Sequence, residues 1–154
     1  MHKTIISDTS CFIILAKINE LELLHQLYGE VYTTVEIAEE YGEHLPDWVV
    51  VVNIKDKLVQ QILELQIDKG ESSALALALE TPNCTLIIDD LKARKIALQL
   101  NIKITGTIGI IIKAKLNKII PSIIPILNKI KETNFFISPE LEFQALQEAN
   151  EVIK

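Results

Sequence analysis

The chain has 154 residues, of which 49% are hydrophobic and 5% aromatic, and its net charge is −6. This length is typical of one domain with a single core, and the apolar content argues against a disordered chain. The negative charge argues against a strong overall attraction to nucleic acids, although the basic residues are unevenly distributed.

The N-terminus lacks the apolar segment that directs secretion, and the longest apolar stretch, 119–127, is too short to span a membrane. Cys11 and Cys84 are widely spaced and lie in apolar surroundings, so we expect buried free thiols and no zinc site. These features predict a soluble, cytoplasmic protein that does not associate with a membrane.

Apolar residues alternate between strand-like and helical patterns along the chain. The predicted elements in order are a strand over 4–7, helices over 11–17 and 21–29, a strand over 31–33, helices over 34–41, 56–66 and 71–79, a strand over 85–88, a helix over 91–100, a strand over 103–105, and helices over 106–116, 121–131 and 139–152. The β-branched segment 49–52 fits either a short strand or an extended connector.

This order predicts an α/β fold in which a central parallel sheet is flanked by helices on both faces. We expect a single domain over 1–154, with the motifs in 4–116 and a helical C-terminal part in 117–154. Six residues at helical spacing are predicted to lie in the core: Leu75, Leu79, Ile96, Leu100, Ile112 and Leu116.

Two of the predicted strands end in carboxylates. Asp8 follows the first strand, and Asp89 and Asp90 follow the strand over 85–88. Because ligands of parallel sheets gather at the carboxyl ends of the strands, we expect these side chains at one edge of the sheet. Clustered carboxylates repel one another unless a cation or a proton is bound, so this pattern predicts a metal site.

Two further acids fall at element ends where they can join this cluster. Glu71 opens the helix before the strand over 85–88, and Glu40 lies on the helix after the second strand. Carboxylates without nearby His or Cys favour Mg²⁺ or Mn²⁺ over zinc, and these ions assist the hydrolysis of phosphodiesters. The expected chemistry is therefore metal-dependent phosphodiester hydrolysis.

Each acid also has a purely structural explanation. Asp8 can cap the helix that follows it, and Glu71 is favoured by the dipole of its own helix. Glu40 belongs to an acidic run over 36–43, which is commonly a solvated helix face. The ligand role is favoured for Asp8, because capping does not explain the second acidic strand end.

Arg94 is the only arginine and stands four residues after Asp90 on a predicted helix. An ion pair between the two is the simplest explanation, and we expect Arg94 to orient the acidic pair. The stretch 91–131 contains nine basic residues and no acidic ones. It fits either a set of solvated helix faces or a groove that follows phosphates.

Five short segments between residues 5 and 116 occur in order with ordinary spacing: Ile-Ile-Ser-Asp8-Thr-Ser10, Ile37-Ala-Glu-Glu40-Tyr41, Gly70-Glu71-Ser-Ser-Ala-Leu-Ala-Leu-Ala, Leu-Ile-Ile-Asp89-Asp90-Leu-Lys-Ala-Arg94 and Gly106-Thr107-Ile-Gly109. Together they resemble the PIN-domain nucleases, most closely the toxin-like branch related to the VapC ribonucleases.

This resemblance implies a single PIN-like domain that binds Mg²⁺ or Mn²⁺ and cleaves single-stranded RNA endonucleolytically. It matches four acids to the metal ligands: Asp8, Glu40, Asp89 and Asp90. Glu71 joins them as a catalytic acid, at a position where many relatives have Asp. The family register also selects Glu40 over Glu39. Three residues are expected to support the site: Ser10, Arg94 and Thr107.

The resemblance is incomplete after the last strand, where many PIN nucleases carry a further acid and this chain has Thr105-Gly106-Thr107. A first metal can still bind, but a second is less favoured and weak activity is one expected outcome. The leading hypothesis is a ribonuclease that acts as the toxin of a toxin–antitoxin pair. Its expected partners are RNA, a cognate antitoxin and a second copy in a homodimer.

Two other hypotheses remain open. The first is a catalytically weak or degenerate PIN-like module that serves binding or dimerisation. The second is a signalling domain with an acidic pocket, which would carry an acidic pair after the first strand and a Lys after the last. This chain has the single Asp8 and Thr105 at those places.

Overall fold

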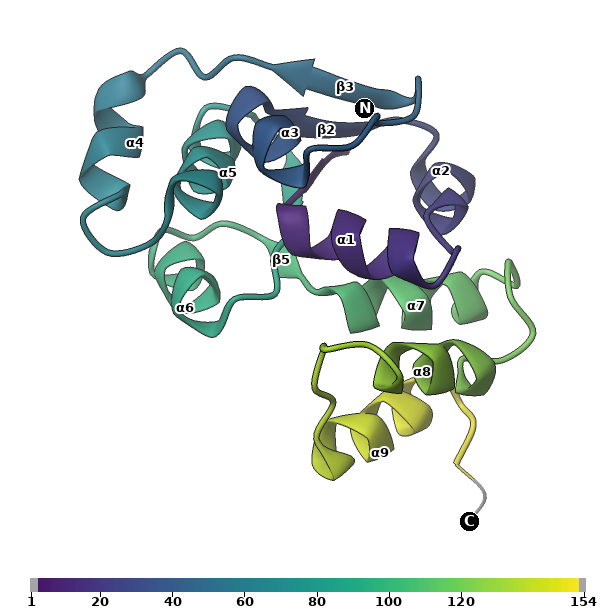
Figure 1. Ribbon diagram of the computed structural model, residues 1–154. Helices are drawn as coiled ribbons and strands as arrows, with labels where there is room; N and C mark the ends of the chain where they lie inside the picture. Colours follow the sequence, from purple (N-terminus) through teal and green to yellow (C-terminus); the bar gives the residue numbers. More distant parts are fainter. Residues whose placement is uncertain (1–2, 153–154) are drawn as a thin grey trace.

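The computed structural model describes residues 3–152, which form a five-stranded parallel sheet with helices packed around it (Figure 1). The strands are β1 (Thr4–Ser7), β2 (Val31–Thr34), β3 (Val49–Val52), β4 (Cys84–Ile87) and β5 (Ile104–Thr105). Their spatial order is β3-β2-β1-β4-β5. The segment that fitted either a strand or a connector is thus the edge strand β3, and the predicted parallel α/β fold is confirmed.

The helices connect these strands and cover both faces of the sheet. In chain order they are α1 (Thr9–Lys17), α2 (Glu22–Tyr28), α3 (Val35–Tyr41), α4 (Lys57–Leu63), α5 (Lys69–Leu79), α6 (Leu91–Gln99), α7 (Thr107–Leu116), α8 (Ile124–Lys131) and α9 (Pro139–Glu148). Helix α5 packs on β1, β2 and β4 and beside α6, whereas α2 packs on β2 and against α7. The crossover from β1 to β2, which contains α2, and the crossover from β3 to β4, which contains α5, run in opposite directions across the sheet. Right-handed crossovers of opposite direction place these two groups of helices on opposite faces. None of the described helices is long and apolar enough to cross a membrane.

The core lies between the sheet and these helices. Ile6 of β1 and Leu86 and Ile87 of β4 are fully buried. The two cysteines are free, with Cys11 buried and Cys84 half-buried.

The predicted core positions are right at Leu75 and Ile112, which are buried, but wrong at the ends of three helices. Leu79, Leu100 and Leu116 are 45%, 38% and 50% exposed. Leu79 and Leu100 line a cavity beside the starts of β4 and β5. These three residues lie on the last turns of their helices, which are less covered than the preceding turns. Helical spacing alone therefore overestimates how many residues of a helix are buried.

The order of the strands reverses at the pair β1 and β4. From this pair the chain leads outward to β2 on one side and to β5 on the other. Ser7 and Ile87 are paired across the two strands. The acidic residues that follow both strands are therefore brought to the point where parallel sheets bind their ligands.

Candidate active site

Asp8 connects the ends of β1 and β4. It is 3% exposed and caps α1, since its Oδ1 accepts the N–H of Cys11 at 2.9 Å. Its Oδ2 accepts the N–H of Asp89 at 3.0 Å. Burial raises the pKa of Asp8 well above its usual value, and the nearby charges of Asp89 and, to a smaller extent, Glu71 add to the rise. Asp8 is therefore both a helix cap and the centre of a local excess of negative charge.

Asp89 is held by the start of α7. Its Oδ1 accepts the backbone N–H of Thr107 at 2.8 Å, and its Oδ2 accepts the Thr107 hydroxyl at 2.5 Å. The preceding Gly106 leaves room for this contact, because a Cβ there would lie 2.9 Å from Asp89 Oδ1 and 2.8 Å from Nη1 of Arg94. The Gly-Thr pair after β5 thus forms a cradle for this carboxylate.

Arg94 contacts the backbone that carries Asp89. Its Nη1 donates to the carbonyl of Ile88 at 2.8 Å. Asp90 instead caps α6 by accepting the N–H of Ala93 at 2.9 Å. The described residues show no ion pair between Arg94 and Asp90, so that expectation is wrong. The helix begins directly after Asp90, which turns this carboxylate toward the free N–H groups of the first turn.

Glu40 reaches the site from the last turn of α3. Its Oε1 accepts the hydroxyl of Thr9 in the first turn of α1. Gly70 in the first turn of α5 provides the space for this carboxylate, because a Cβ at that position would collide with Oε1. Glu40 is thereby held between the starts of α1 and α5.

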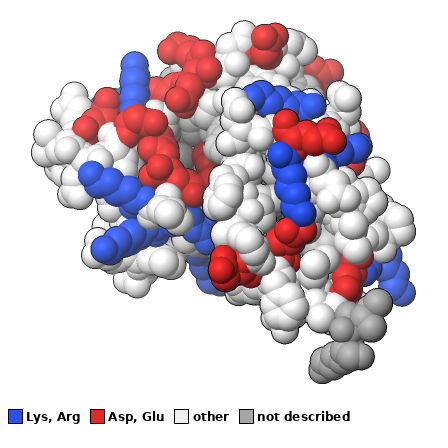
Figure 2. Space-filling view, turned by 60° about the horizontal axis from the view of Figure 1, so that its bottom comes forward, with Lys and Arg blue, Asp and Glu red and all other residues white. Residues whose placement is uncertain are grey.

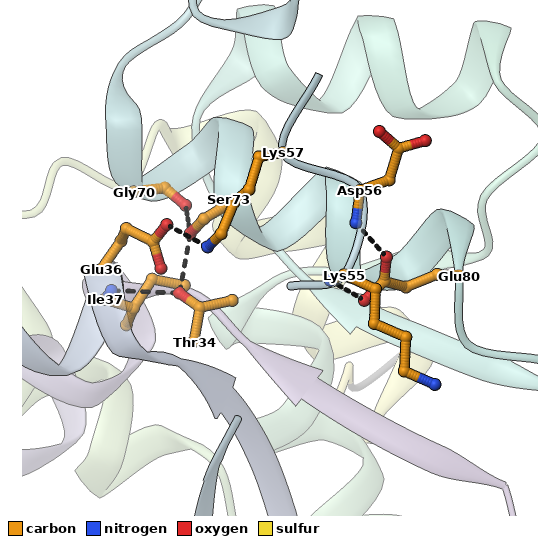
Figure 3. Close-up of polar contacts among 9 residues, drawn as sticks. All are labelled: Thr34, Glu36, Ile37, Lys55, Asp56, Lys57, Gly70, Ser73 and Glu80. Atoms are coloured by element: carbon orange, nitrogen blue, oxygen red, sulfur yellow. Dashed lines mark hydrogen bonds and ion pairs between the residues drawn. The ribbon is translucent and has the colours of Figure 1, made fainter. Parts of the chain in front are cut away.

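A chain of hydrogen bonds fixes α3 against α5 (Figure 3). Thr34 caps α3 by accepting the N–H of Ile37 at 3.1 Å, and its hydroxyl lies 2.7 Å from Oγ of Ser73. Ser73 donates to the carbonyl of Gly70 at 2.7 Å, which leaves the Thr34 hydroxyl as the donor between the two side chains. This network fixes the separation of the two helices that position Glu40.

Glu71 lies in the first turn of α5 and is half-buried. Burial raises the pKa of Glu71 from 4.5 to about 7, and the charges of Asp68 and Asp90 contribute to the rise. Asp68 caps α5 by accepting the N–H of Glu71 at 2.8 Å. Sequence reasoning missed Asp68 as a member of the cluster, although Asp three residues before Glu at a helix start is a recognisable capping pattern.

Two neighbouring cavities are lined by these acids, with the exception of Asp90. A cavity of about 340 Å³ is lined by Asp8, Glu40, Asp68 and Glu71, together with Ser10 and Lys17 of α1. A cavity of about 440 Å³ is lined by Asp89, Arg94 and Gly106. Phe135, between α8 and α9, lines both. Its position depends on how the C-terminal helices pack, so no pattern in the sequence indicated it. On the face shown in Figure 2, acidic side chains gather around a hollow, with basic side chains beside them.

The basic residues of the stretch 91–131 are distributed over separate parts of the molecule. Lys115, Lys129 and Lys131 each pair with a Glu from another segment. Lys103 and Lys113 line cavities at the amino-terminal edge of the sheet, away from the acids. The structure therefore contradicts a single continuous basic groove, because the helices that carry these residues leave the sheet in different directions.

The donors fit a hydrated divalent cation in type and charge. In the part of the chain that the structure describes, no Lys, Arg or His forms an ion pair with any of the predicted acids Asp8, Glu40, Glu71, Asp89 and Asp90. Within residues 3–152, no three His, Cys, Asp or Glu side chains are grouped closely enough to hold a metal by themselves. Mg²⁺ usually keeps several waters and binds through one or two carboxylates and the substrate phosphate. The site therefore fits such an ion better than one enclosed by protein ligands.

Comparison with known proteins identifies the family. A family model described as a PIN domain (DUF3368) matches residues 4–151, which include every described strand and helix. Searches of curated proteins and of solved structures gave no significant match to the chain. PIN domains are generally nucleases and usually use divalent metal ions. The assignment to a VapC-like branch stays a prediction. The chain belongs to the PIN-domain family.

Proposed function

We propose that this protein is a metal-dependent endoribonuclease that hydrolyses phosphodiester bonds of single-stranded RNA. The observation that carries the proposal is a group of acids at the strand-order reversal of a PIN domain, which no cation of residues 3–152 pairs with. Asp8 and Asp89 are joined by a hydrogen bond there, and Glu40 and Glu71 line the adjoining cavity. Carboxylates in such an arrangement attract a cation that can in turn bind phosphate.

The proposed ligands of Mg²⁺ or Mn²⁺ are drawn from Asp8, Glu40, Asp89 and Asp90, of which one or two would bind the ion directly and the others through its waters. When bound, the ion would activate a water molecule and stabilise the charge that develops on the leaving oxygen. The surrounding residues contribute positioning. Backbone N–H groups hold both oxygens of Asp8, while Thr107 holds those of Asp89. These contacts orient the carboxylates before any substrate binds, which lowers the cost of reaching the reactive geometry.

Glu71 is proposed as the acid–base residue of the site. Its carboxyl group lines the same cavity as Asp8 and Glu40. A pKa near 7 makes both protonation states accessible at neutral pH, so its carboxyl oxygen can accept a proton from water or return one to the leaving group.

The direct test is cleavage of a labelled single-stranded RNA by the purified protein with Mg²⁺ or Mn²⁺. We expect cleavage by the wild-type protein, its loss in EDTA, and a rate at least about 100-fold lower for Asp8→Asn. Asp47→Asn, which changes an exposed acid in a turn, is the matched control and should cleave at the wild-type rate. Melting temperatures should verify that both variants fold.

Two outcomes would overturn the proposal. Cleavage that persists in Asp8→Asn or in EDTA would show that the activity does not depend on these acids or on a metal. A folded wild-type protein that cleaves no RNA with either ion would favour the degenerate binding module.

The proposed biological role is the toxin of a toxin–antitoxin pair, with an antitoxin and a second copy of this chain as partners. A small reading frame beside the gene, whose product relieves growth inhibition when coexpressed, would support this role. Mass measurement in solution tests the homodimer.

A further inference from the structure

We infer that Phe135 divides the cleft into two nucleotide subsites and stacks against a base next to the bond that is cleaved. This inference rests on the proposed function, because it concerns how the same site takes hold of a single RNA strand.

Phe135 lies where the two cavities meet. On one side of it are Asp8 and Glu71, and on the other are Asp89 and Arg94. A strand that crosses the acids from one cavity to the other must therefore pass the Phe135 side chain. Because Asp8 and Asp89 are joined directly, the bond nearest to the acids would lie close to this crossing point.

A defined turn holds Phe135 in place. The hydroxyl of Thr133 donates to the carbonyl of Ile130 at 2.6 Å and accepts the N–H of Phe135 at 3.1 Å. Ile130 and Ile137, on either side of the turn, are buried in the core. The ring is itself half-buried and packs on this core, so its position is set before a ligand arrives.

The surroundings of Phe135 suit a single nucleic acid strand. Among the described residues, the lining of the first cavity includes the cation Lys17 and that of the second includes Arg94. Each of these side chains can contact a backbone phosphate. Aromatic rings stack on any base, but only where the base is not already stacked in a duplex. We therefore expect selection of single strands with little dependence on base identity.

The test compares Phe135→Leu with Phe143→Leu as a matched control. Phe143 lies on α9, is 54% exposed and is not part of the lining of either cavity. Phe135→Tyr keeps the ring and serves as the conservative variant. The probe is a fluorescein-labelled single-stranded RNA decamer, with binding measured by anisotropy in Ca²⁺ and cleavage measured separately in Mg²⁺ or Mn²⁺.

We expect Phe135→Leu to weaken binding of the decamer by about tenfold, since a stacked base contributes on this scale. Phe143→Leu and Phe135→Tyr should bind within about twofold of the wild-type protein, and the same decamer in a duplex should bind at least about tenfold more weakly. In cleavage, the loss in Phe135→Leu should fall mainly on KM, because the ring binds the strand without taking part in the chemistry.

Unchanged binding by Phe135→Leu, or equal losses in both Leu variants, would overturn the inference. It would also be overturned if Phe135→Leu changed the oligomeric mass and left RNA binding intact, because the ring would then belong to a protein interface. A wild-type protein that binds the decamer through Phe135 but cleaves nothing would instead contradict the proposed function and leave the stacking role standing.

Discussion

Replacing Glu71 by Gln is expected to stabilise the metal-free protein at alkaline pH and to have little effect at acidic pH. Burial and the charges of Asp68 and Asp90 raise the pKa of Glu71 from 4.5 to about 7 in the folded state. Between these values the folded chain binds more protons than the unfolded chain, so stability falls as the pH rises. The cost of this ionised group is fully present above about pH 7 and disappears toward pH 4.5.

The size of the effect follows from the rise in pKa and from exposure. A rise from 4.5 to about 7 corresponds to roughly 3 kcal/mol for a fully buried group. Because Glu71 is only half-buried, solvent screening reduces the expected effect to about 1–2 kcal/mol. For a chain of this size, such a change shifts the melting temperature by about 3–6 °C.

Urea unfolding followed by circular dichroism, in EDTA at pH 5 and pH 8, measures this difference. Glu64→Gln, which alters an exposed acid at the end of α4, is the control and should show no pH-dependent gain. Equal gains in stability of Glu71→Gln at both pH values, or a variant less stable than the wild-type protein at pH 8, would contradict a cost of ionising Glu71.

Two further substitutions test how the carboxylates are positioned. Gly70→Ala should displace Glu40 from its place beside Thr9 and lower cleavage about tenfold, while melting stays the same or rises because Ala favours the helix by up to about 1 kcal/mol; full activity would show that Glu40 is not needed there. Thr107→Val should lower the free energy of unfolding in urea by about 1–3 kcal/mol and reduce cleavage, because Asp89 loses the hydrogen bond from the Thr107 hydroxyl. Thr107→Ser keeps a hydroxyl and should retain both stability and cleavage. Equal stability of the Val and Ser variants would contradict this role.

The main geometry of the site could be predicted from strand ends alone. Two apolar runs that end in Asp8 and Asp89 become adjacent parallel strands, and the pairing of Ser7 with Ile87 brings the following residues together. This inference succeeded because parallel strands end at one edge of a sheet and side chains just beyond them share that edge.

Contacts that depend on side-chain packing could not be predicted in this way. The fit of Glu40 against Gly70 requires the separation of α3 and α5, which buried hydrogen bonds through Ser73 determine. Local pairing also misled, since Asp90 caps its helix and Arg94 contacts the carbonyl of Ile88. Helix capping by Asp90 and the hydrogen bond of Arg94 to a backbone carbonyl thus replace the ion pair that the spacing of the two residues suggests.

The distribution of charge shows the same limit. A basic stretch that is continuous in sequence spans α6, α7 and α8, and the structure spreads its lysines over different edges of the molecule. Of the two interpretations of the basic stretch, solvated helix faces or a groove, the structure therefore disfavours the groove. The carboxylates Asp8 and Asp89 lie together because they follow neighbouring strand ends.

Diffraction from crystals soaked in Mn²⁺, recorded at the manganese absorption edge, shows whether these carboxylates hold a metal ion. We expect an anomalous peak within coordination distance of the carboxylates of Asp8 or Asp89, and loss of this peak in Asp8→Asn crystals. A peak elsewhere only, or none at millimolar Mn²⁺ with both carboxylates bonded as in the metal-free protein, would contradict this expectation.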